Sequence, residues 1–199
     1  MIEKQVSLIL IFIASLIAEL IDGSIGMGYG VSFSTFLISF GIGTAVASAI
    51  VHISEVVTAL FSGIIHINHG NFEAKTFLYL ALPGVIGASL GSITAIKFQN
   101  ISILRVLVSI ILFLLGMLIL IKYVRKKQLI EYKVPRIRKL LPLGFFAAFI
   151  DALGGGGWGP ITTPALIASH ADPKKTIGSV NAAEFFVAVS ASIIFIIFL

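Results

Sequence analysis

Four carboxylic acids interrupt apolar stretches of the sequence, and their placement points to proton or ion chemistry. They are Asp22, Glu55, Asp151 and Glu184. An ionised carboxylate is costly at membrane depth, and acids found there usually serve a function. We therefore predict that these four residues couple protons to the activity of the protein. The alternative is structural, with each carboxylate capping or hydrogen-bonding the backbone at a nearby helix break.

Two glycine-rich segments offer a second kind of chemistry. Residues 22–30 read Asp-Gly-Ser-Ile-Gly-Met-Gly-Tyr-Gly, and residues 154–160 read Gly-Gly-Gly-Gly-Trp-Gly-Pro. Glycine lets the backbone approach a ligand closely, and polar breaks between apolar half-helices are where membrane transporters bind substrates. Because few Lys or Arg residues lie in the apolar spans, an anion would depend on backbone N–H groups at the positive ends of the half-helices.

The predicted binding residues combine these glycines with nearby polar and aromatic side chains. His52 and Asn181 each lie three residues before one of the glutamates, on the same helix face. The alternatives are interior hydrogen bonding for these two side chains, packing or an interfacial position for the aromatic ones, and tight hairpin packing for the glycines. The residues that we predict to bind a substrate are Gly26, Gly28, Tyr29, Gly30, His52, Gly155, Gly157, Trp158, Gly159 and Asn181.

The composition places the chain in a membrane. It has 199 residues, of which 58% are hydrophobic and 12% charged, and its mean hydropathy is +1.09. Soluble domains carry about a quarter charged residues. The net charge of +5 does not indicate a nucleic-acid partner, because eight of the fourteen Lys and Arg residues lie within 122–139, a pattern typical of one cytoplasmic loop. The chain has no cysteine, which excludes disulfide and thiol chemistry.

The hydropathy pattern predicts an all-α membrane protein whose helices position these residues. Residues 5–21 nearly cross the hydrocarbon core, with a cleavable signal peptide as the alternative. Residues 31–40 are too short to span and fit a half-helix or one arm of a re-entrant hairpin. In the second half, an apolar stretch starts at residue 140, a short helix pattern ends near 168, and a final span reaches 199. Full spans in the first half are predicted over residues 44–66, 76–96 and 102–122.

Two other motifs carry little weight. The spacing of Gly23, Gly26 and Gly28 is close to a dinucleotide-binding fingerprint, but no βαβ unit surrounds it. A metal site in the loop that holds His66 and His69 would need more ligands than the loop offers. We therefore expect no metal and no cofactor.

The two halves of the sequence repeat with an offset of 129 residues. The offset places Asp22, Glu55 and each binding glycine of the first half on a like residue of the second half, which chance apolar similarity would not do. We predict a first repeat over residues 1–122, a basic cytoplasmic loop over 123–139, and a second repeat over 140–199. The second repeat is incomplete, because it has no counterpart of residues 71–122. We expect either that the sequence is truncated or that another chain supplies these spans.

Charge predicts that the two repeats are inverted. If the basic loop is cytoplasmic, counting three spans back places residues 41–46 outside the cell. In the second repeat the equivalent turn contains Lys174 and Lys175 and lies inside. Each repeat is therefore expected to hold a glycine-broken re-entrant hairpin followed by transmembrane helices, with the two breaks meeting from opposite sides of the membrane. Bulky residues at Gly28 and Gly157 should then impair binding similarly.

The residues of the two breaks resemble the TauE/SafE family of membrane proteins, the sulfite exporter or TSUP group. The resemblance rests on residues 19–30, Glu-Leu-Ile-Asp-Gly-Ser-Ile-Gly-Met-Gly-Tyr-Gly, and on Asp151 followed by the glycine run that ends in Trp-Gly-Pro. It implies a secondary transporter in the bacterial inner membrane that exports small sulfur-containing anions, such as sulfite or sulfoacetate, with proton coupling. Alternating access would take place at the repeat interface, the surroundings would be membrane lipid, and a homo-oligomer is compatible with the resemblance.

Two other classes of function compete with this interpretation. One is an intramembrane enzyme that uses the paired carboxylates and histidine, although no Ser–His pairing stands out in the sequence. The other is a membrane subunit that does not itself transport, which the incomplete second repeat favours. Substrate flux in proteoliposomes separates the transporter from both.

Overall fold

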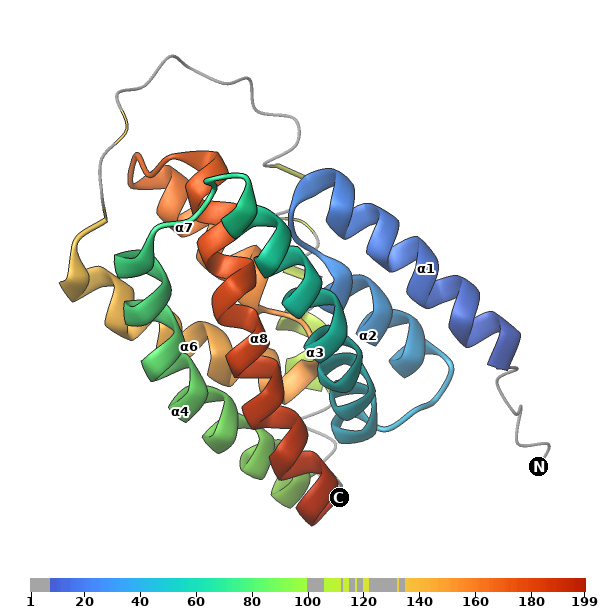
Figure 1. The fold of residues 1–199 in the computed structure, drawn as a ribbon. Helices are drawn as coiled ribbons and strands as arrows, with labels where there is room; N and C mark the ends of the chain where they lie inside the picture. The colour runs from blue at the N-terminus through green and yellow to red at the C-terminus, as the bar shows by residue number, and fades with distance from the viewer. Residues whose placement is uncertain are drawn as a thin grey trace, which may run out of the picture.

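The structure is a computed structural model, and it describes residues 8–99, 106–111, 113–114, 117, 120–121, 132 and 135–199. Its secondary structure over these residues is helical throughout (Figure 1). Residues 106–111 are helical as well, whereas most of the basic loop lies outside the described residues, as does part of the span expected over 102–122. The named helices are α1 (Leu8–Ile25), α2 (Tyr29–Ser39), α3 (Thr44–Asn68), α4 (Ala74–Phe98), α6 (Ile137–Gly154), α7 (Trp158–Ala168) and α8 (Pro173–Phe198).

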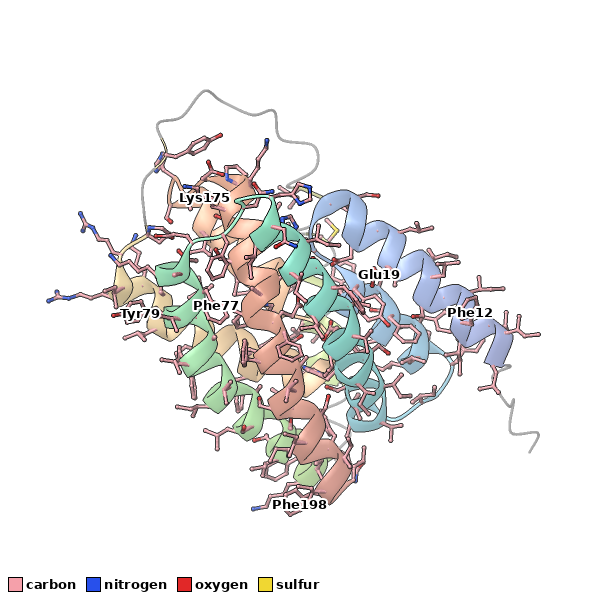
Figure 2. All side chains as sticks on the ribbon, in the orientation of Figure 1. Phe12, Glu19, Phe77, Tyr79, Lys175 and Phe198 are labelled. Carbon is pink, nitrogen blue, oxygen red and sulfur yellow. The ribbon has the colours of Figure 1, made fainter. Side chains whose placement is uncertain are left out.

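Among the described residues, four helices are long and apolar enough to cross a membrane: α1, α3, α4 and α8. At 1.5 Å per residue, the 18 residues of α1 reach about 27 Å, close to the thickness of the hydrocarbon core. Most large apolar side chains of α1 face outward, and Phe12 projects away from the other helices (Figure 2). Such an apolar outer surface fits lipid or another helix rather than water.

The helix bounds confirm the spans predicted over 44–66 and 76–96 and correct the predicted ends of several elements. The first break covers residues 26–28 rather than 22–30, because α1 continues through Asp22 to Ile25. In the second half α6 begins at Ile137, inside the predicted basic loop, and continues through Asp151 to Gly154. Both acids therefore lie in the last turn of a helix, not in an unwound segment.

The two broken helices end in the same way. The Gly26 N–H donates to the Asp22 carbonyl oxygen at 2.6 Å, and the Gly155 N–H donates to the Asp151 carbonyl oxygen at 2.6 Å. Gly26 has φ +76° and Gly155 has φ +71°, the left-handed conformation that ends many helices and that glycine adopts without steric cost. Each helix ends where a glycine takes this conformation. The earlier glycines, Gly23 of α1 and Gly154 of α6, remain helical.

The helix bounds recur with the sequence offset. Subtracting 129 from the bounds of α6 and α7 returns the bounds of α1 and α2, and the same shift moves the first residue of α8 onto the first residue of α3. Figure 1 shows α2 folding back beside α1, so that the first pair forms a hairpin. Equivalent sequence segments thus form equivalent local structure.

Small residues allow the central helices to touch. A Cβ built on Gly91 of α4 would lie 2.5 Å from the Phe149 carbonyl oxygen of α6, and one on Gly144 of α6 would lie 2.5 Å from the Leu80 carbonyl oxygen of α4. The small-residue stripe predicted on residues 76–96 therefore serves close backbone packing. The packed centre is formed mainly where α4 runs along α6 and α8 and where α3 runs along α8.

Helices α3 and α8, which hold the two glutamates, run antiparallel. Gly63 of α3 packs on Ala182 of α8, with a built Cβ 3.1 Å from the Ala182 Cα atom. Eleven residues earlier on α3, His52 faces Phe195 of α8, with 6.0 Å between the ring centroids. Residue numbers fall along α3 where they rise along α8, so the two helices run in opposite directions.

Candidate functional site

The two glycine breaks lie against each other, backbone to backbone. A Cβ on Gly30 would lie 2.7 Å from the Gly155 carbonyl oxygen, and a Cβ on Gly156 would collide with the Val31 backbone nitrogen. On the other side of this contact, a Cβ on Gly159 would lie 3.1 Å from the Met27 Cβ atom. The glycines are required here because no side chain fits between the two chain segments.

The contacts around the breaks occur in equivalent pairs. A Cβ on Gly26 would lie 2.9 Å from the Ile177 side chain, and one on Gly155 would lie 2.9 Å from the Ser48 Cα atom. Under the offset of 129 residues, Gly26 corresponds to Gly155 and Ser48 to Ile177. Each break therefore packs against the start of the long helix that follows the other break.

A small cavity lies where the breaks meet. Its volume open to the centre of a water molecule is about 10 Å³, room for about one water. It is lined by residues of both breaks and by polar side chains of α3 and α8: Asp22, Gly26, Met27, Gly28, Tyr29, Gly30, Val31, Glu55, Asp151, Gly156, Gly157, Trp158, Gly159, Pro160, Asn181 and Glu184.

The structure brings the predicted site residues together. All four predicted proton-coupling acids line the cavity, and so do the predicted binding residues other than His52 and Gly155. His52 contacts the cavity residue Asp151 directly, and Gly155 contacts Gly30. Sequence reasoning missed Met27 and Gly156, which correspond to each other under the repeat offset and lie at the centres of the two breaks. The repeat offset could have identified both residues as part of the site.

In the first repeat the Asp22 side chain binds the N-terminus of α2. The Tyr29 backbone N–H at the start of α2 donates to the Asp22 Oδ1 atom at 3.1 Å. This bond satisfies one of the N–H groups left free at a helix N-terminus and places a carboxylate at its positive end. The capping role considered for Asp22 is therefore present in the structure. The Tyr29 hydroxyl forms a separate hydrogen bond with the Ser15 Oγ atom at 3.0 Å.

In the second repeat the acid binds a histidine instead. The Asp151 Oδ2 atom lies 3.1 Å from the His52 Nε2 atom, and both side chains are buried. The His52 Nδ1 atom lies 2.8 Å from the Ser48 carbonyl oxygen. A carbonyl oxygen only accepts hydrogen bonds, so Nδ1 carries a proton. One further proton must then lie between Nε2 and Oδ2, and the pair has no net charge whether histidine or aspartate holds it.

The glutamates and Asn181 differ in their surroundings. Glu55 is only 4% exposed, and among the described residues its Oε2 atom has no hydrogen-bond partner. Glu184 is half-buried. The Asn181 Nδ2 atom donates to the Ser62 Oγ atom at 2.7 Å, so Asn181 does not repeat the contact that His52 makes. The two halves of the site are therefore equivalent in backbone but different in hydrogen bonding.

Trp158 is held by packing as well as by its place at the cavity. Its Nε1–H donates to the Val180 carbonyl oxygen at 3.0 Å, and its ring lies 3.2 Å from a Cβ built on Gly84. The indole N–H is therefore occupied by the backbone of α8. This hydrogen bond ties the start of α7 to α8.

Three of these side chains are grouped closely enough to hold a metal ion. His52, Glu55 and Asp151 each place one ligand atom within 4.8 Å of the others. The loop histidine His69 instead has its Nδ1 atom 2.8 Å from the Ile65 carbonyl oxygen. The absence of a metal at this group stays a prediction.

The helices and the site together define an all-helical, multi-pass membrane protein with an acid-lined cavity between two broken helices. The family model for the sulfite exporter TauE/SafE matches residues 11–199. The chain therefore belongs to the sulfite exporter TauE/SafE family, as the residues of the two breaks predicted.

A curated relative of the same kind is the probable membrane transporter protein YtnM of Bacillus subtilis (strain 168). The two sequences are 45% identical over 194 residues. The alignment covers 96% of this chain and 64% of the relative, so the chain spans less than two thirds of the relative's length. No solved structure matches the chain.

Proposed function

We propose that the chain forms the substrate-binding part of a secondary transporter that exports small sulfur-containing anions, such as sulfite or sulfoacetate, with proton coupling across the bacterial inner membrane. The observation that carries the proposal is the convergence of two helix N-termini and four carboxylic acids on one cavity. Helix N-termini attract anions, and membrane-depth acids carry protons. Membership of the sulfite exporter family supplies the class of substrate.

We propose further that residues 1–122 and 140–199 are inverted repeats. The antiparallel course of α3 and α8 supports this arrangement, because equivalent helices of inverted repeats cross the membrane in opposite directions. The paired contacts of the two breaks support it as well. A dyad in the membrane plane would place both breaks at one depth, where a substrate can be reached from either side.

Proton coupling follows from the charges around the cavity. Four acids line it, and no Lys or Arg is among the described residues that do so. If all the acids were ionised, they would repel an anion strongly at this low dielectric. Protonation from one side of the membrane removes that repulsion, so binding of the anion and of protons are mutually favourable.

Transport also requires the cavity to change size. Room for about one water is too small for sulfite or a sulfonate group, so the structure represents a closed state. The two breaks contact each other mainly through glycine backbone, and a sliding or rocking of one repeat on the other would open the cavity to one side. We propose that this motion is the alternating-access step.

Flux in proteoliposomes tests the proposal. Liposomes containing the protein and loaded with radiolabelled sulfite are diluted into buffers of lower, equal and higher pH, and release is followed over time. Release faster than in empty liposomes, and dependent on the pH difference, is expected. Absence of flux for sulfite and for sulfoacetate would refute the transporter. Turnover of membrane lipid without flux would instead favour an enzyme, and neither activity would favour a non-transporting subunit.

A further inference from the structure

We propose that the anion binds at the N-terminus of α7 alone, and that the equivalent position at α2 is closed by the protein's own Asp22 carboxylate. This inference rests on the proposed function and assigns different tasks to its two repeats. The ligand class is a small oxyanion whose oxygens accept hydrogen bonds from backbone N–H groups.

The first backbone donor of α2 is already taken by a carboxylate. The Asp22 Oδ1 atom accepts the Tyr29 N–H at 3.1 Å, which places a carboxylate where an anionic ligand would bind. Helix N-termini bind carboxylate, phosphate and sulfate groups through the same N–H groups. A second anion at α2 would have to displace a carboxylate that is covalently part of the chain and lies only seven residues away.

The N-terminus of α7 is open. Asp151 lies seven residues before Trp158, as Asp22 does before Tyr29, yet its carboxylate contacts His52. Within the part of the chain that the structure describes, no side chain caps α7, and the backbone N–H groups of Trp158 and Gly159 donate to no protein acceptor. The next residue, Pro160, has no N–H group. The first donor of α7 is therefore free, whereas the equivalent donor of α2, the Tyr29 N–H, is bound to the Asp22 carboxylate.

His52 accounts for the different contacts of Asp151 and Asp22. Its counterpart in the second repeat is Asn181, which binds Ser62 instead of an acid. His52 draws the Asp151 carboxylate away from α7, and the resulting pair has no net charge. The carboxylate that would compete with an anion is thus both displaced and neutralised.

A second observation points independently to a ligand in the cavity between the breaks, where the Glu55 Oε1 atom lies 3.0 Å from a Cβ built on Gly30. The Glu55 Oε2 atom is buried and has no partner among the described residues, although Glu55 lines the cavity. A buried carboxyl oxygen without a partner is costly, and such an atom needs an explanation. When Glu55 is protonated, its O–H group provides a third donor, and an oxygen of the anion provides the missing acceptor.

A variant in which the Asp151 carboxylate is free to bind the N-terminus of α7 tests the inference. The substitution His52→Asn leaves Asp151 without its buried partner, and its carboxylate is then expected to turn to the Trp158 N–H, as Asp22 does in the first repeat. We expect the affinity for sulfite to fall about tenfold or more, judged from the strength of helix capping. Sulfite binding to the purified protein is measured by titration calorimetry, with thermal unfolding recorded for each variant.

A double variant separates this mechanism from a loss of structure. His52→Asn combined with Asp151→Ala removes the competing carboxylate, so the affinity is expected to rise again by about threefold or more above that of His52→Asn alone. The matched control is His69→Asn, a change of the same kind at the end of the same helix and away from the cavity. It should leave the affinity unchanged.

The outcomes are distinct. An unchanged affinity in His52→Asn, or no recovery in the double variant, would overturn the inference. If the wild-type protein transports sulfite but is indifferent to His52→Asn, the proposed function stands and this inference fails. If sulfite binds with the expected pattern but does not cross the membrane, the inference stands and the transport function fails.

Discussion

A single methyl group at Gly156 is predicted to separate the two broken helices. In Gly156→Ala the new Cβ would lie 2.6 Å from the Gly30 carbonyl carbon and 2.7 Å from the Val31 Cα atom. Ordinary contacts at such a position begin at 3.4 Å, so the segments must part by at least about 0.8 Å, the difference between 3.4 and 2.6 Å, and by more at the Val31 nitrogen, which is nearer still. The atoms met are backbone atoms, which cannot rotate away as a side chain could.

The expected loss of stability in Gly156→Ala follows from the cost of overpacking. Inserting one methyl into a rigid contact typically costs about 1–3 kcal/mol. For a chain of this size that corresponds to a decrease in Tm of about 2–12 °C. The change also moves the start of α7 away from the cavity by more than the roughly 0.5 Å that a binding site tolerates. We therefore expect loss of sulfite binding and flux together with the lower stability.

Gly23→Ala is the matched control. Gly23 lies inside α1, and a Cβ built there meets nothing within 4 Å. Because alanine is a better helix former than glycine, this variant should gain roughly 0.5–1 kcal/mol. Tm is measured in detergent and flux in proteoliposomes for both variants. Equal Tm and equal flux in Gly156→Ala and Gly23→Ala would refute the close backbone contact between the breaks.

Other substitutions separate stability from function. Gly28→Ala is expected to destabilise the protein by about 1 kcal/mol because Gly28 has φ +116°, whereas Gly157→Ala, at φ −175°, avoids that backbone strain; denaturation midpoints that fall equally would contradict this difference. Glu55→Gln and Glu184→Gln should each weaken the dependence of sulfite flux on the pH gradient, and an unchanged rate and pH dependence in both would exclude their role in coupling. Trp158→Phe removes one hydrogen bond to the α8 backbone and should cost about 1 kcal/mol of stability, with sulfite affinity in calorimetry unchanged.

The different backbone angles at the two glycines refine the expectation drawn from the repeat. Equivalence in sequence predicted similar defects at Gly28 and Gly157. In the structure Gly28 has left-handed φ, whereas a Cβ on Gly157 would meet the Asp151 backbone nitrogen at 3.1 Å. A binding defect at both positions stays a prediction, but the accompanying loss of stability should be greater at Gly28.

Much of the fold was predictable because its signals are local. Apolar stretches of 20 or more residues specify membrane helices, and α3 and α4 lie close to where the hydropathy pattern placed them. Helix ends were less predictable. The first break was expected to begin at Asp22, yet Gly23 and Ser24 remain helical, because the end depends on which glycine takes left-handed φ.

The candidate site was predictable as a set of residues but not as an arrangement. The offset of 129 residues paired Asp22 with Asp151 and His52 with Asn181 before any contact was known. It could not show that Glu19 also buries a carboxyl oxygen without a partner among the described residues. Glu19 has no acidic counterpart in the second repeat, so the repeat signal does not include it.

The sequence by itself determined the membrane class, the two glycine breaks, the pairing of the repeats and the family, because composition, spacing and motif identity are properties of the chain. Only the tertiary structure decided how equivalent residues differ. Asp22 caps α2 while Asp151 pairs with His52, since the choice depends on which donor lies within hydrogen-bond distance of each carboxylate. The Asp151–His52 contact joins residues 99 positions apart in the chain, and the repeat in the sequence carries no information about which distant side chains meet.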